Sequence, residues 1–176
     1  MCLMQHFLTD RSKFVRILFA GAALVLGLVV YLLYRSPESV YLLPVGLFPE
    51  NASASLPGFE VLSRYAPSFL HVYAFILLTA IVLVMSHVTA LIISAAWLCL
   101  ELVLEIGQSE SVSTVIVSWL PMWFRDYPFL ENIGPYFSLG TFDYGDMLAI
   151  VCGSVAAYLT LRLTENREHS HVMPEA

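Results

Sequence analysis

The chain carries little charge, and this excludes several classes of protein at once. Only 12% of its 176 residues are charged, whereas a soluble domain carries about 25%. So few charges leave too little polar surface to cover a water-exposed globule. The eight Lys and Arg residues form no basic stripe and the formal net charge is −6, which argues against nucleic acid as a partner.

Cysteines are few, and familiar catalytic motifs are absent. Cys2, Cys99 and Cys152 show neither CxxC nor Cys/His ligand spacing, so we interpret them as small apolar residues. The sequence contains no serine-nucleophile motif, P-loop, GxGxxG or HExxH. We therefore predict no cofactor.

What the chain does contain is hydrophobic length, with 59% hydrophobic residues and a mean hydropathy of +0.77. Four apolar runs each approach the roughly 20 residues that a membrane-spanning helix needs. They predict an all-α, four-helix transmembrane bundle with helices at about 14–34, 66–86, 88–107 and 146–163. We assign residues 1–163 to this single domain and 164–176 to a flexible polar tail. We interpret the first helix as a retained signal anchor rather than the alternative, a cleaved signal peptide, because no small-x-small cleavage site follows within residues 32–38.

One further apolar stretch, residues 112–124, is too short to span a membrane. It contains Trp119, Pro121 and Trp123. This composition is typical of an interfacial or re-entrant helix broken near Pro121, with its tryptophans at headgroup level. A buried cap over the bundle is the alternative.

Basic residues predict the orientation of the bundle. An even number of spans puts both termini on one side and the two long connections on the other. The terminal segments hold five basic residues and the long connections hold three: Arg11, Lys13, Arg16, Arg162 and Arg167 against Arg35, Arg64 and Arg125. The positive-inside rule then predicts a multi-pass protein of the cell inner (plasma) membrane with both termini cytoplasmic.

The third predicted helix carries a polar stripe. Ser94, Glu101, Glu105 and Gln108 project onto one face when each residue turns by about 100°. Glu101 lies roughly 9–10 Å below the outer boundary at the helical rise per residue. A charged stripe at membrane depth must face the bundle interior or a water-filled cleft.

Other polar residues occupy the same depth on other helices. We expect His71 about one turn inside its helix, and Asp143 and Asp146 at the start of the last helix. With Glu101, Glu105 and Gln108, they form the predicted polar binding cleft. The alternatives are a hydrogen-bonded interfacial residue for His71, a simple N-terminal cap for Asp146, a turn residue for Asp143, and solvated headgroup-level residues for Glu105 and Gln108. The spacing selects no metal site, and none is predicted.

The last predicted helix also has a close-packing face. Ala149, Gly153 and Ala157 follow a small-xxx-small spacing on nearly the same side as Asp146. We expect this face to bring Asp146 toward a neighbouring helix, which we predict to be the helix at 88–107.

Three segments resemble the VanZ-like family of small bacterial membrane proteins. They are SFLHVYAF around His71, LELVLEIGQ with Glu105 and Gln108, and GTFDYGDMLAIVCGSVAAYL with Asp143, Asp146 and Gly153. The resemblance covers roughly residues 67–108 and 140–160. It implies a membrane bundle of four or more helices, linked in some members to resistance against glycopeptide antibiotics such as teicoplanin.

The chain departs from the pattern of that family at three places. Pro67 and Ser68 precede the histidine where the family usually has a basic residue. Ile150 stands where the family usually has asparagine, and no arginine occurs around residues 140–141.

Three functions follow as hypotheses. The first is a VanZ-like membrane protein whose outward-facing cleft binds an envelope lipid or a membrane protein partner without turnover. The second is an intramembrane acid/base enzyme acting on a lipid-linked substrate, with a Glu as general base and His71 as acid or orienting group. The third is a structural or assembly subunit of a membrane complex. In all three the lipid bilayer is a partner.

Overall fold

The computed structural model describes residues 2–34, 59–83 and 86–170, and within these ranges all regular secondary structure is helical. The all-α fold class is therefore confirmed for the described residues. Four helices are long, and between the third and fourth of them lie two short α-helices and two 3-10 helices. In chain order they are α1 Cys2–Tyr34, α2 Phe59–Val82, α3 His87–Gly107, α4 Glu110–Trp119, η3 Met122–Asp126, η4 Leu130–Asn132, α5 Ile133–Leu139 and α6 Tyr144–Ser170.

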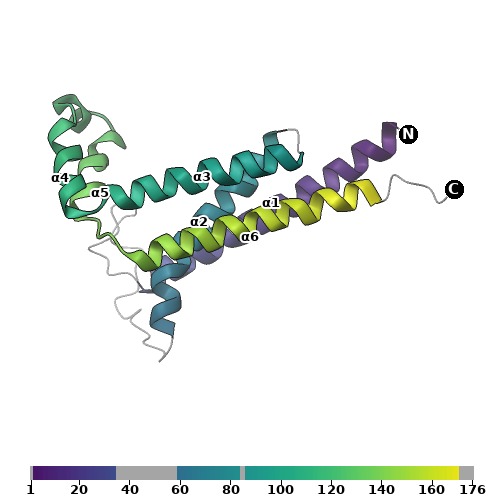
Figure 1. Cartoon of the computed structure of the whole chain (residues 1–176), viewed down its shortest axis with the longest axis horizontal. Helices are drawn as coiled ribbons and strands as arrows, with labels where there is room; N and C mark the ends of the chain where they lie inside the picture. Colours follow the sequence, from purple (N-terminus) through teal and green to yellow (C-terminus); the bar gives the residue numbers. More distant parts are fainter. Residues whose placement is uncertain (1, 35–58, 84–85, 171–176) are drawn as a thin grey trace.

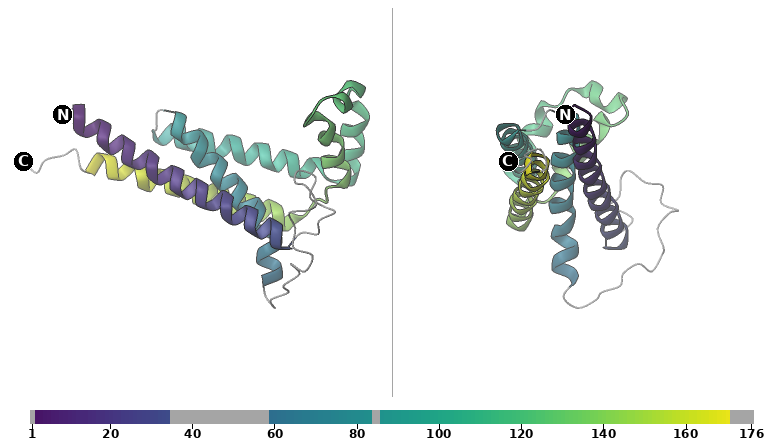
Figure 2. Two further views of the ribbon diagram at one scale, coloured as in Figure 1. Left: turned by 180° about the vertical axis from the view of Figure 1, so that it is seen from behind. Right: turned by 90° about the vertical axis from the view of Figure 1, so that its right-hand side faces the viewer.

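The long helices form a bundle in which α2 and α6 are central. Helix α2 packs between α1 and α6, and α3 packs against both α6 and α2 (Figures 1 and 2). The beginning of α1 and the end of α6 lie at one end of the bundle, called here the terminal end (Figure 1). Helices α4 and α5 lie at the opposite end, where α3 ends and α6 begins, called here the polar end.

Each long helix is long and apolar enough to cross a membrane. The candidate spans are Arg11–Val30, Ser63–Val82, His87–Gly107 and Tyr144–Glu165. Large apolar side chains remain exposed along their outer faces, for example Phe14, Leu18, Leu91, Val103 and Leu148. A water-soluble monomer rarely exposes so much continuous apolar surface. Length and composition together indicate a multi-pass membrane protein.

Several helix bounds differ from those predicted. Helix α1 begins at Cys2 rather than at residue 14, and α2 ends at Val82 rather than at residue 86. Helix α2 begins at Phe59 rather than at residue 66, and it contains Pro67 in its interior. Proline removes one backbone hydrogen bond but is tolerated in a helix that bends, and α2 bends in its first half (Figure 1).

At the other end of the chain, α6 continues to Ser170 and includes the first part of the predicted flexible tail. The packing explains this extension. Thr164 accepts a hydrogen bond from Arg16 at 3.1 Å, and Glu165 is only 4% exposed. Residues 171–176 and most of the first long connection, 35–58 with Arg35, lie outside the described residues.

The connections after α2 and α3 differ in character. Ser86 caps α3 by accepting a hydrogen bond from the Thr89 N–H at 3.1 Å. The apolar stretch 112–124 forms most of α4 and part of η3, and the chain is extended at Leu120, as expected before Pro121. Trp119 in this stretch is 83% exposed.

Candidate functional site

The polar end of the bundle is organised around Glu105, in the last turn of α3. Its side chain is nearly buried, with the residue 8% exposed. The carboxylate oxygen Oε1 accepts a hydrogen bond from the Asp143 backbone N–H at 2.9 Å. Glu105 also interacts electrostatically with the side chains of Asp143 and Asp146. A bond across 38 residues of sequence thus joins the end of α3 to the start of α6.

Asp143 connects the start of α6 to α2. Its Oδ1 accepts a hydrogen bond from the Gly145 N–H at 2.8 Å, and its backbone carbonyl accepts one from the Asp146 N–H at 3.1 Å. Its Oδ2 forms an ion pair with Nη2 of Arg64 at 2.9 Å, and the Tyr65 hydroxyl lies 3.5 Å away. Asp143 is therefore both a capping residue for α6 and a contact between helices.

Asp146 lies in the first turn of α6 and also contacts α2. The hydroxyl of Ser68 donates a hydrogen bond to its Oδ1. A carboxylate at this position also suits the positive end of the helix dipole. Asp146 therefore serves an interhelical contact as well as the helix start.

The close-packing face of α6 meets α2, and not α3 as the sequence predicted. A Cβ atom placed on Gly153 would lie 2.5 Å from the Phe69 carbonyl oxygen and 2.7 Å from a Val72 methyl carbon. The backbones of α2 and α6 therefore approach each other where Gly153 has no side chain. The prediction was wrong about the helix that Gly153 contacts, because small-residue spacing identifies a face without identifying what packs on it. Helix α6 also packs against α3, and Asp146 interacts electrostatically with Glu105 of that helix. The other small residues of this face are Ala157, which is fully buried, and Ala149, which is partly buried.

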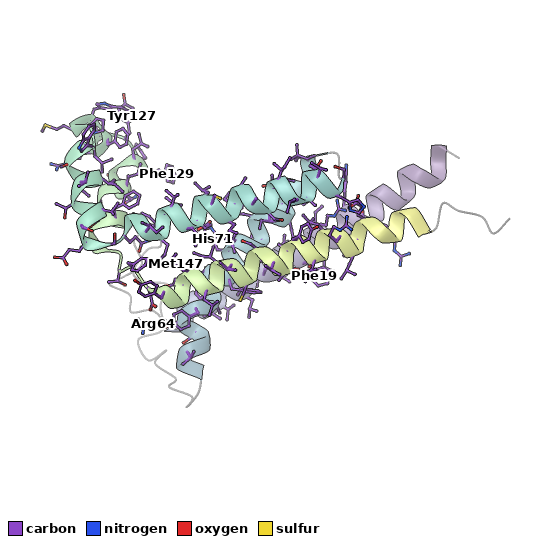
Figure 3. The ribbon with its side chains drawn as sticks, viewed as in Figure 1. Phe19, Arg64, His71, Tyr127, Phe129 and Met147 are labelled. Carbon is purple, nitrogen blue, oxygen red and sulfur yellow. The ribbon has the colours of Figure 1, made fainter. Side chains whose placement is uncertain are left out.

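His71 on α2 faces Glu101 on α3. The His71 Nδ1 lies 3.6 Å from Oε1 of Glu101, and the two side chains are 54% and 13% exposed. The imidazole ring makes an edge contact with Phe75, with ring centroids 4.4 Å apart. His71 lies about two helical turns from Ser63, deeper than the predicted single turn, because α2 begins earlier than expected. Figure 3 labels His71 together with Arg64, which lies nearer the start of the same helix α2.

Gln108, at the C-terminal cap of α3, contacts the short helix α5. Its side chain forms a hydrogen bond with the Tyr136 hydroxyl, which also interacts electrostatically with Glu101 and Glu105. Partial burial raises the pKa of Tyr136 above its usual value, an effect that the Gln108 hydrogen bond opposes. A Cβ on Gly140 would collide with the Gln108 side chain and would lie 2.7 Å from the Tyr136 carbonyl oxygen, so a glycine here makes room for this contact.

The six predicted cleft residues thus lie at the polar end. They come from α2, from α3 and the residue that caps it, and from α6 and the residue that precedes it. They are joined in two groups: Glu105 with Asp143 and Asp146, and His71 with Glu101, while Gln108 contacts α5. Glu101 and Glu105 interact electrostatically, which links the groups. We define this set as the polar cluster; its residues are His71, Glu101, Glu105, Gln108, Asp143 and Asp146.

Sequence reasoning missed three contributors to the polar cluster: Arg64, Ser68 and Tyr136. Arg64 had been assigned to a loop, but it lies in α2. Residues 64, 68 and 71 follow the i, i+4, i+7 spacing of one helical face. A helix predicted from Phe59 would have revealed this face.

A second group of polar contacts lies at the terminal end, where the sequence analysis assigned no site. Buried Arg16 donates a hydrogen bond to Thr164 at 3.1 Å. The nearly buried Glu165 carboxylate lies 3.4 Å from His87 Nδ1 and 3.9 Å from Arg162 Nη1. These contacts connect α1, α3 and α6. They hold α6 in the bundle just beyond its predicted end at residue 163.

A pocket of about 790 Å³ adjoins the polar cluster. It lies between α4 and the segment that joins α5 to α6, and its lining includes Gln108, Gly140 and Phe142. Among the described residues, no group of three or more His, Cys, Asp or Glu side chains is arranged to hold a metal ion. Cys99 and Cys152 are free and exposed on α3 and α6.

Comparison with models of protein families, with curated proteins and with solved structures finds no match to this chain.

Proposed function

We propose that the chain is a VanZ-like integral membrane protein of the cell envelope, and that the polar cluster binds an envelope component. The observation that carries this proposal is the convergence of acidic side chains from α3 and from the start of α6 at the polar end of the bundle. Glu105 is nearly buried and accepts the Asp143 N–H at 2.9 Å, and Glu101 lies beside His71. Ionisable groups at membrane depth are costly and usually serve a function.

The balance of charge at the polar cluster supports a ligand with hydrogen-bond donors or a positive charge. Four carboxylates meet there, and the nearby basic groups are Arg64 and His71. Arg64 lies beside Asp143, while Glu101 and Glu105 lie deeper along α3. An amine or a hydroxyl-bearing head group would complement Glu101 and Glu105.

The proposal places the protein in the inner membrane, with both termini cytoplasmic and the polar end facing outward. The basic residues in the terminal segments support this orientation through the positive-inside rule. The exposed tryptophans Trp119 and Trp123 support headgroup level for the α4 region. An outward polar end would give the polar cluster access to extracytoplasmic envelope components. Binding of such a component is the link that we propose to glycopeptide resistance, which the resemblance to the VanZ-like family implies.

Single substitutions test the polar cluster. Glu101→Gln, Glu105→Gln and Asp146→Asn each remove a negative charge and keep the shape of the side chain. Glu131→Gln is the matched control, because Glu131 is exposed on η4 and lies outside the polar cluster. We expect the three cluster variants to lower growth in teicoplanin of cells that express the chain, while the control matches the unmodified protein. Folded yield is measured for each by size-exclusion chromatography.

If all three cluster variants fold and grow in teicoplanin like Glu131→Gln, the polar cluster does not bind the relevant component.

The pairing of His71 with Glu101 at 3.6 Å supports a second candidate, an intramembrane acid/base enzyme acting on a lipid-linked substrate. In this candidate Glu101 is the general base and His71 orients it or donates a proton. His71→Gln would then abolish turnover of a lipid-linked substrate and leave its binding intact. If His71→Gln loses binding of the lipid-linked substrate, and the unmodified protein shows no measurable turnover of it, the first proposal is favoured.

A subunit of a membrane complex is the remaining candidate. It predicts a partner protein that copurifies in fixed proportion and tolerance of the cluster substitutions.

A further inference from the structure

The pocket beside α4 is unusually rich in hydroxyl groups. Its volume of about 790 Å³ falls within the roughly 300–1,000 Å³ typical of small-molecule sites. Six of its lining residues carry a hydroxyl: Ser109, Ser113, Thr114, Ser118, Ser138 and Thr141. The lining therefore combines these hydroxyl groups with a largely apolar surface, and most of the polar contacts that it offers a ligand are hydrogen bonds rather than ion pairs.

Four of these hydroxyls already donate their hydrogen to the backbone. Ser109 donates to the Ile106 carbonyl at 2.7 Å, and Ser118 donates to the Val115 carbonyl at 2.7 Å. Ser113 and Thr114 both donate to the Glu110 carbonyl, at 3.2 and 2.8 Å. Because a hydroxyl has a single hydrogen, these oxygens remain as acceptors. The pocket therefore favours a ligand that supplies several donors.

The charge and the apolar surface of the pocket further restrict the chemical class of ligand that it can bind. Its lining contains one ionisable side chain, Glu110, and no Lys, Arg or His. The lining offers no cationic side chain to pair with a phosphate or sulfate group, and the Glu110 carboxyl group disfavours an anion. Val117 and Phe142 supply apolar surface in the same pocket. A neutral sugar has many O–H donors together with apolar C–H faces.

We propose that this pocket binds a neutral sugar head group, presented by a membrane glycolipid. The membrane source is supported by the position of the pocket, since α4 begins where the spanning helix α3 ends. The exposed tryptophans Trp119 and Trp123 lie at the end of α4 and in η3, in a composition typical of the headgroup region. The pocket shares Gln108 with the polar cluster, but none of the acidic residues of that cluster lines it.

The test uses the full chain in lipid nanodiscs and native mass spectrometry. The probes are monoglucosyl diacylglycerol and phosphatidylglycerol with the same acyl chains. Thr114→Val combined with Ser118→Ala removes two acceptors, and Ser111→Ala is the matched control because Ser111 is exposed on α4 outside the lining. We expect the unmodified chain to retain the glycolipid in preference to phosphatidylglycerol. Loss of two hydrogen bonds should weaken this retention about tenfold, and the control should leave it unchanged.

Free methyl glucoside distinguishes the two sources of the sugar. Displacement of the glycolipid by methyl glucoside supports a sugar site that also accepts free saccharides, whereas retention supports dependence on the lipid anchor.

Equal retention of the two lipids by the unmodified chain overturns the proposal, and this measurement requires no variant. Unchanged retention in the folded double variant overturns it as well. Glu105→Gln changes the polar cluster and leaves the pocket lining intact, so it should leave glycolipid retention unchanged whether or not the polar cluster proposal holds. The two proposals can therefore fail separately.

Discussion

Replacing Gly153 by alanine perturbs a close approach between the backbone of α2 and α6. The added Cβ would lie 2.5 Å from the Phe69 carbonyl oxygen and 2.7 Å from a Val72 methyl carbon. The carbonyl belongs to the backbone of α2, so it cannot rotate away as a flexible side chain would. One helix must shift, and the shift acts on the Ser68 and Asp146 contact two turns away.

The expected magnitude follows from two opposing effects. Overpacking a tight contact costs about 1–3 kcal/mol. Alanine in place of glycine stabilises a helix interior by about 1 kcal/mol. Gly21→Ala on α1 is the matched control, because nothing lies within 4 Å of the Cβ that it adds. The propensity effect is common to both variants, so the difference between their free energies of unfolding should be about 1–3 kcal/mol, with Gly153→Ala less stable.

The assay is unfolding by sodium dodecyl sulfate in mixed micelles, followed by far-UV circular dichroism. Gly21→Ala should match or slightly exceed the unmodified protein in stability. The reasoning is refuted if Gly153→Ala is as stable as Gly21→Ala, since α2 and α6 would then not meet at this glycine.

Three further outcomes are expected. A double-mutant cycle with Arg64→Gln and Asp143→Asn should give a coupling free energy of only about 0.2–1 kcal/mol, because the Arg64 side chain is 66% exposed; a larger coupling would mean that the pair is shielded from solvent. The pKa of Tyr136 is raised in the folded protein, so its phenol stays neutral to higher pH than in the unfolded chain. Its contribution to stability is therefore complete below the unfolded-state pKa of about 10 and is lost as the pH rises through the folded-state pKa. The phenolate absorbance titrations of the unmodified protein and of Tyr136→Phe should therefore differ by one tyrosine that ionises at a higher pH than a free tyrosine. If that tyrosine ionises at the pH of a free tyrosine, the prediction is contradicted. Brominated lipids with shallow bromines should quench Trp119 and Trp123, and the Trp119→Phe/Trp123→Phe variant should lose that shallow quenching; quenching confined to deep bromines contradicts headgroup level.

Local patterns in the sequence predicted the polar stripe of α3 well. Glu101 and Glu105 were expected to face inward from their helical spacing alone, and their low exposure agrees with this. The stripe is predictable because the positions of residues on one helix follow from the period of about 3.6 residues per turn.

The start of α2 could not be predicted in the same way. Pro67 is compatible with the beginning of a helix and with a bent helix interior, and nothing in its local sequence separates the two. Arg64 and Ser68 therefore went unrecognised as partners of Asp143 and Asp146, although they lie on the same helical face as His71.

By itself, the sequence determined that this protein has four helices of membrane-spanning length, and which face of α3 is polar. Both properties depend on residues that are close together in the chain. Only the tertiary structure decided that Gly153 of α6 packs on α2, that Arg64 meets Asp143, and that hydroxyl groups of α4 line a pocket beside the polar cluster. The physical reason is that the lateral order of helices depends on the fit of side chains between segments far apart in sequence, and the pattern along one helix does not contain that fit.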